Sequence, residues 1–256
     1  MITLYDSDQH KNIMFYDLTK GEMVQANQHI IIDGNEAMLI DPGGHKVYSE
    51  LISQMAASAR IENLKYLFFS HQDPDIIAAA NGWLMLTDAT AYLSQLWMRF
   101  IPHFGVDDYV VNRIKAIPDE GMSLYLNSKE LKVIPAHFLH SPGNFQVYDP
   151  ISKILYSGDL GASLGSGQTS VASFDEHIPF MEGFHKRYIA SSTALKMWVK
   201  MIRDLDIEIE MIAPQHGAIF PNKEMVEKFI SWIDTLECGL DLMKNGFRMS
   251  QEKEST

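Results

Sequence analysis

Apolar residues along this chain fall into short runs separated by turn-forming residues, and the runs have two different periods. The runs at 28–33 and 36–44 flank Gly34-Asn35, a dipeptide typical of a β-hairpin turn. Continuous apolar runs predict further strands over 64–70, 130–136, 145–149, 152–159 and 209–217. Apolar residues at helical spacing predict helices over 46–61, 75–87, 188–206 and 222–243. Strands with helices between and after them are the element order of packed sheets with helices outside.

Two segments depart from these patterns. Residues 81–105 are dense in Trp, Met and Phe and carry no recognisable motif. Their apolar density predicts core and a helical lid over the sheet, with a subunit interface as the alternative. Residues 247–256 have the composition of a disordered tail. We expect everything else in 1–256 to form a single domain.

The composition of the chain limits which binding partners and which cellular compartment we expect for the protein. The chain has 256 residues, 46% of them hydrophobic, which suits one large domain. Its 33 acidic and 21 basic residues give a net charge of −12 with no Lys/Arg-rich stretch, which argues against nucleic acid and anionic membranes as partners. The single cysteine, the lack of a secretory signal and the lack of a membrane-length apolar run predict a cytoplasmic protein. No Gly-rich phosphate loop supports nucleotide chemistry.

Polar residues that interrupt apolar runs form the candidate site. Six such residues stand at or just after predicted strands, most of them beside Gly or Pro: His71, Asp73, Asp75, His140, Asp159 and His216. Bringing carboxylates together at strand ends is costly unless a positive charge lies among them. Three histidines and three carboxylates form a hard, oxygen-rich set that suits iron or manganese better than zinc. The alternative for each residue alone is an ordinary turn residue or a hydrogen-bonded histidine.

The order of these motifs resembles the metallo-β-lactamase superfamily. The matching stretches are "LIDPGG" at 39–44, "HQDPD" at 71–75, "HSPG" at 140–143, "GD" at 158–159 and "PQHG" at 214–217. The resemblance covers residues from about 25 to about 220. It implies an α+β fold in one domain, the metallo-β-lactamase-like αβ/βα sandwich, with metals at one edge.

Within that superfamily the chain is similar to the flavodiiron branch, which carries a carboxylate where hydrolases have a histidine. Here that position is Asp73, and Ile76 stands where hydrolases have another histidine. Flavodiiron proteins add a flavodoxin domain with FMN, and neither is expected in this chain. The sequence resembles instead the oxygen-binding diiron proteins. That resemblance implies two non-haem Fe ions, with Mn or Zn as possible substitutes, and O2 bound as a peroxo-type adduct. It also implies an oxygen sensor linked to signalling or chemotaxis, and a homodimer.

The same resemblance assigns roles to residues. One metal takes His71, Asp73 and His140, and the other takes Asp75 and His216, with Asp159 bridging the two. Tyr188 and His185 are expected around the O2 pocket, where the Tyr188 phenol would donate a hydrogen bond. Ile76 is expected to leave one metal with an open position. The alternative for Ile76 is that its side chain simply packs beneath the following helix.

Three other functions stay open at this point. One is a metallohydrolase acting on a small ester, thioester or phosphodiester. Another is an O2- or NO-reductase-type domain that uses external electron donors. The last is a lactamase-fold scaffold that has lost its metal. We expect an O2-binding sensor rather than a turnover enzyme, with residual oxidoreductase activity as the alternative.

Overall fold

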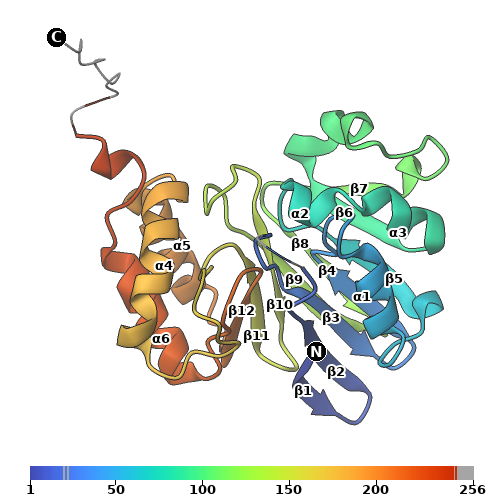
Figure 1. Cartoon of the computed structure of the whole chain (residues 1–256), viewed down its shortest axis with the longest axis horizontal. Coiled ribbons are helices and arrows are strands. Elements are labelled where there is room, and N and C mark those ends of the chain that lie inside the picture. Colours follow the sequence, from blue (N-terminus) through green and yellow to red (C-terminus); the bar gives the residue numbers. More distant parts are fainter. Residues whose placement is uncertain (20, 22, 245, 247–256) are drawn as a thin grey trace.

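The computed structural model of the chain describes residues 1–19, 21, 23–244 and 246. The tail expected at 247–256 lies outside these residues. Two β-sheets face each other in the middle of the molecule, with α1–α3 on one outer side and α4–α6 on the other (Figure 1). This arrangement confirms the predicted αβ/βα sandwich.

Within the described part of the chain, the first sheet has seven strands in chain order, with antiparallel pairing at its start and parallel pairing from β4 onward. Its strands are β1 (Ile2–Ser7), β2 (His10–Phe15), β3 (Gln28–Asp33), β4 (Glu36–Ile40), β5 (Leu64–Phe68), β6 (Thr90–Ser94) and β7 (Ile114–Ile117). The helices on its outer face are α1 (Tyr48–Met55), α2 (Pro74–Ile77) and α3 (Ala80–Leu86). Short 3₁₀ helices span Ile61–Asn63, Gln95–Phe104 and Val111–Arg113.

Over the residues that the structure describes, the second sheet has five strands in the order β12-β11-β10-β9-β8, and only β11 and β12 run parallel. Its strands are β8 (Met122–Leu126), β9 (Lys129–Pro135), β10 (Phe145–Asp149), β11 (Ile154–Gly158) and β12 (Met211–Pro214). The outer helices are α4 (Phe174–Tyr188), α5 (Ser192–Asp204) and α6 (Lys223–Thr235), with a last 3₁₀ turn at Leu240–Leu242.

The core lies in three layers, which explains why the strands read as nearly continuous apolar runs. Between the sheets, Met14, Ile31 and Phe68 pack with Phe145 and Tyr156. Two further buried clusters fill the spaces between each sheet and its helices. A strand whose two faces are both covered has no solvent side to alternate with, so β3 and β10 are buried along their full length.

Several elements differ from the sequence prediction. The segment 81–105 is not a helical lid throughout, because β6 lies within it and a 3₁₀ helix follows. The helix predicted over 75–87 is two short helices, α2 and α3. The helix predicted over 222–243 ends at Thr235, and α5 begins at Ser192 rather than 188. Within the described residues, no helix is long and apolar enough to cross a membrane.

Candidate metal centre

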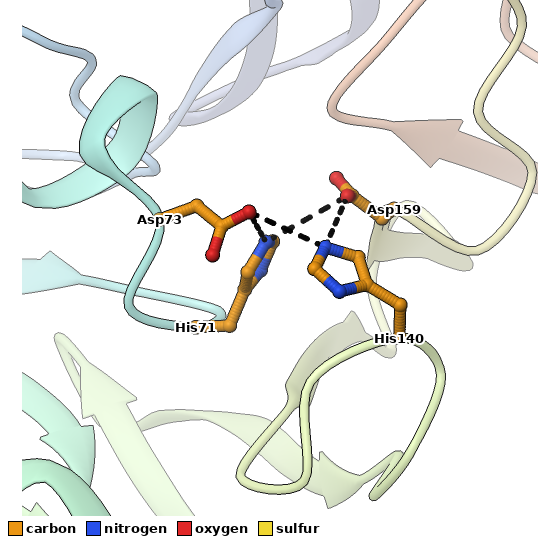
Figure 2. Close-up of side chains that lie close together, drawn as sticks. All are labelled: His71, Asp73, His140 and Asp159. Atoms are coloured by element: carbon orange, nitrogen blue, oxygen red, sulfur yellow. Dashed lines mark ion pairs between the residues drawn. The ribbon is translucent and has the colours of Figure 1, made fainter. Parts of the chain in front are cut away.

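Four loops that follow strands β5, β9, β11 and β12 bring the six predicted residues to one place. Four of these side chains, His71, Asp73, His140 and Asp159, converge from three segments of the chain (Figure 2). One ligand-type atom from each lies within 4.8 Å of the others, which is the spacing of a site that can hold a metal ion.

The centre of this group is the Oδ2 atom of Asp159. It lies 2.8 Å from Nε2 of His140 and 3.7 Å from Nε2 of His71. Oδ2 of Asp73 lies 3.4 Å from Nε2 of His140 and 3.7 Å from Nε2 of His71. Two imidazole nitrogens and two carboxylate oxygens therefore face a common point.

The other oxygen of Asp159 faces a second group. Oδ1 of Asp159 lies 3.6 Å from Nε2 of His216, which in turn lies 3.3 Å from Oδ2 of Asp75. The Asp159 carboxylate thus stands between His71, Asp73 and His140 on one side and Asp75 and His216 on the other. A carboxylate in this position is able to bridge two cations.

Local backbone geometry explains how Asp73 and Asp159 reach the centre. Asp73 is the N-cap residue of α2, with Pro74 beginning the helix, yet its side chain makes no capping hydrogen bond. An aspartate at this position usually accepts from the helix N–H groups, so its carboxylate is left free for the site. Gly158 has φ +58°, and a Cβ there would come within 3.2 Å of the Ser70 Oγ. The Gly-Asp turn therefore needs glycine to swing Asp159 inward.

Neighbouring groups fix the orientation of two of the histidines. Nδ1 of His216 donates to the Gln25 carbonyl at 2.6 Å, so Nε2 faces the carboxylates. Nδ1 of His71 lies 2.9 Å from the Ser70 Oγ, and the Ser70 backbone N–H donates to Asp41 at 2.8 Å. Asp41, in the "LIDPGG" stretch, was not predicted as a site residue, and burial raises its pKa to about 6. Partners of this kind are typical of histidines that bind metals.

The electrostatics show a site that attracts positive charge. Burial alone would lower the pKa of His140, but Asp159 and Asp73 raise it to about 10. Burial also lowers the pKa of His216, but Asp75 and Asp159 outweigh it and raise this pKa to about 9. Burial raises the pKa of Asp73, and its contacts with His140 and His71 outweigh that and lower it. Protons on the imidazoles stabilise these carboxylates, and metal cations would do the same.

Two buried atoms of the centre have no hydrogen-bond partner among the described residues: Nε2 of His71 and Oδ1 of Asp159. A buried polar atom without a partner is costly and calls for an explanation such as an ion. Both atoms point into the space between the ligand-type side chains, and the donor set is nitrogen and carboxylate oxygen. The residues present therefore fit a pair of divalent iron or manganese ions.

The three residues expected around the O2 pocket lie in different surroundings. His185 is fully buried, donates from Nδ1 to Met181 O at 2.9 Å and accepts at Nε2 from the backbone N–H of Gly161 at 3.0 Å. It therefore supports the loop that carries Asp159. The Tyr188 ring centroid lies 5.9 Å from that of His140, beside the site. Ile76 is fully buried in the core cluster under α2 and α3, which supports the packing alternative for its side chain.

Comparisons with known proteins agree with this geometry. A family model described as ODP family beta lactamase matches residues 24–217. The chain belongs to this family. A solved structure described as a peroxy diiron species of the chemotaxis sensor ODP is 41% identical to this ODP-family chain. The match covers 96% of this chain and 100% of the other, with a TM-score of 0.86. The apo state of chemotaxis sensor ODP from T. denticola is 38% identical, covers 96% and 98% of the two chains, and has a TM-score of 0.83.

More distant relatives are longer. An anaerobic nitric oxide reductase flavorubredoxin of Pectobacterium atrosepticum is 20% identical over an aligned length of 236, and the match covers 86% of this chain and 45% of the relative. The ODP-family chain therefore spans less than half the length of the curated relatives it matches. The predicted flavodiiron-like branch of the lactamase fold is confirmed.

Proposed function

We propose that this protein is a cytoplasmic non-haem diiron protein that binds dioxygen and acts as an oxygen sensor. The observation that carries the proposal is the Asp159 carboxylate, which stands between two groups of ligand-type side chains. The 41% identity to the chemotaxis sensor ODP, described as a peroxy diiron species, supports the choice of metal and ligand.

In this proposal His71, Asp73 and His140 would hold one iron and Asp75 and His216 would hold the other, with Asp159 as the carboxylate that would be shared by both. Once bound, the irons would supply the affinity for dioxygen. The protein supplies charge and orientation, because three carboxylates offset most of the charge of two divalent cations. Gln25 and Ser70 keep the ring nitrogens of His216 and His71 directed at the centre.

The ring of Tyr188 places a phenol near His140, and we propose that it donates a hydrogen bond to bound dioxygen. Replacing Tyr188 with Phe tests this role. We expect Tyr188→Phe to keep two irons and to shorten the lifetime of the oxygenated form. An unchanged lifetime would remove Tyr188 from the oxygen pocket.

The proposal as a whole is tested by elemental analysis followed by exposure to oxygen. We expect two irons per chain, and a new visible absorption band when the anaerobic ferrous protein meets O2. Two zincs with ester or phosphodiester hydrolysis would favour a metallohydrolase instead. Metal well below one ion per chain would favour a scaffold without a metal function.

Reductase activity is the second candidate, since the curated relatives are nitric oxide reductases. We propose sensing first because the relatives that match along their full length are chemotaxis sensors. Continuous consumption of O2 or NO with an external electron donor would reverse that order. The proposal also includes a homodimer and a chemotaxis-type signalling partner. Light scattering during gel filtration tests the dimer.

A further inference from the structure

Two glutamines beside the centre contact the carboxylates that follow His71 in the sequence. The side-chain Nε2 of Gln72 donates to Oδ1 of Asp73 at 2.9 Å. The side-chain Nε2 of Gln215 donates to Oδ2 of Asp75 at 3.2 Å. Each glutamine is adjacent in sequence to a proposed histidine ligand, and each reaches a different group of the centre.

The direction of both hydrogen bonds follows from the chemistry of the partners. An ionised carboxylate only accepts, so each glutamine must present its NH₂ group to the aspartate. For Gln72 the other end of the amide is also fixed, because Ser141 Oγ donates to Gln72 Oε1 at 2.6 Å. Ser141 follows His140 in the "HSPG" loop, so this pair of bonds joins the loop of His71 to the loop of His140.

The backbone of Gln215 is fixed by two hydrogen bonds. Its N–H donates to Gly158 O at 2.7 Å, and its carbonyl accepts from the Asn27 N–H at 2.5 Å. The residue is 1% exposed, and its side-chain Oε1 has no hydrogen-bond partner in the part of the chain that the structure describes. A buried amide oxygen without a partner costs free energy of folding. Packing alone does not explain that cost, whereas the hydrogen bond from the same amide to Asp75 gives the side chain a role at the centre.

We propose that Gln72 and Gln215 are positioning residues, each of which orients one carboxylate and sets the affinity of one metal position without affecting the other. This inference rests on the proposed diiron centre. Hydrogen bonds to ionised groups are short and strong, and they hold an acidic ligand in one rotamer before the metal arrives.

The Gln72 bond has a further consequence for Asp73. Oδ1 is engaged by the amide, while Oδ2 lies 3.4 Å from His140 Nε2 on the side of the centre. Asp73 therefore offers one oxygen rather than two.

The test uses Mn²⁺ as a redox-silent probe and counts bound ions by electron paramagnetic resonance. Two backgrounds isolate the two positions: Asp75→Asn keeps the position of His71, Asp73 and His140, and Asp73→Asn keeps the other. Gln72→Met and Gln215→Met, which retain length and lose the N–H donor, are placed in each background. Gln146→Met is the matched control, because buried Gln146 bonds to Ser157 O and Trp198 and not to a carboxylate.

We expect Gln72→Met to weaken Mn²⁺ binding roughly 10–100-fold in the Asp75→Asn background and to leave binding unchanged in the Asp73→Asn background. Gln215→Met should show the opposite pattern, and Gln146→Met should change neither. Ser141→Ala should weaken the same position as Gln72→Met and add little to it in the double variant, because Ser141 acts through Gln72.

Equal weakening by either glutamine variant in both backgrounds would overturn the inference, as would no weakening in any. Both results leave the proposed function standing if the unmodified protein still binds two ions. Failure of the unmodified protein to bind Mn²⁺ or Fe²⁺ would instead overturn the proposed function itself. Thermal melting of the metal-free variants checks that each is folded.

Discussion

Replacing Asp159 with Asn removes the one carboxylate that faces both groups of the centre. Oδ2 lies 2.8 Å from His140 Nε2 and Oδ1 lies 3.6 Å from His216 Nε2. The amide keeps the size of the side chain and one acceptor oxygen while the negative charge is lost. We therefore expect Asp159→Asn to weaken both metal positions, whereas Asp73→Asn and Asp75→Asn each weaken mainly one.

The charges of the centre give the magnitude. With neutral histidines, two divalent cations and three carboxylates leave one net positive charge, and the amide raises it to two. Removing one partner from a buried ion pair costs about 3–5 kcal/mol. Since each 1.4 kcal/mol is a factor of ten, affinity should fall by about two to four orders of magnitude.

Competition with a chelator of known affinity, followed by elemental analysis, measures the loss. The assay compares the unmodified protein with Asp159→Asn, Asp73→Asn and Asp75→Asn under the same conditions. The chelator concentration is set just below the one that removes metal from the unmodified protein. Under these conditions we expect the unmodified protein to keep close to two ions, Asp159→Asn to keep none, and Asp73→Asn and Asp75→Asn to keep about one each. Retention of both ions by Asp159→Asn would refute the bridging role.

Three further predictions concern residues around the centre and in the core. Burial lowers the pKa of His10, but the contacts of His10 with Asp149 and Asp33 outweigh burial and raise this pKa above 6.5. Burial raises the pKa of Asp149, but its contacts with His10 outweigh burial and lower it below 3.8. Their contribution to stability should be complete between these values, fall as pH rises through the folded pKa of His10, and fall as pH drops through that of Asp149. Urea unfolding across pH should show both slopes, and His10→Gln should remove them. His185→Phe leaves the buried Gly161 N–H without its acceptor, so unfolding should cost about 1–3 kcal/mol less and chelators should remove metal more easily. Ile76→Ala should lower stability by about 2–5 kcal/mol and keep two irons and the oxygen band, and a changed band at unchanged stability would instead place Ile76 in the oxygen pocket.

The sequence predicted best those elements whose apolar runs end at clear turn signals. β3 and β10 have the predicted bounds, because both are buried on two faces and bounded by turn residues. β1 and β2 were missed because charged residues interrupt their apolar positions. Helix α4 was missed because it carries Pro179 in its interior and has a largely polar sequence, so that its stability depends on packing against α6, for example of His185 against Phe229.

For the candidate site, the sequence predicted which residues take part but not the contacts that hold them in place. Motif order and residue type were sufficient to select His71, Asp73, Asp75, His140, Asp159 and His216, which the fold brings together. The contacts of Gln72, Gln215 and Asp41 were not foreseeable, because they depend on side-chain rotamers and on loops far apart in the sequence. The bond of His185 to Gly161 is of the same kind, since it joins residues 24 positions apart.

The central claim is that two irons at this centre bind dioxygen and retain it. Stepwise addition of O2 to the anaerobic diferrous protein, with dissolved oxygen and visible absorption recorded together, tests it most directly. We predict that the absorption band saturates at about one O2 for every two irons and that consumption then stops when no electron donor is present. No uptake by a protein that holds two ferrous ions would contradict the claim, as would continued consumption beyond that ratio.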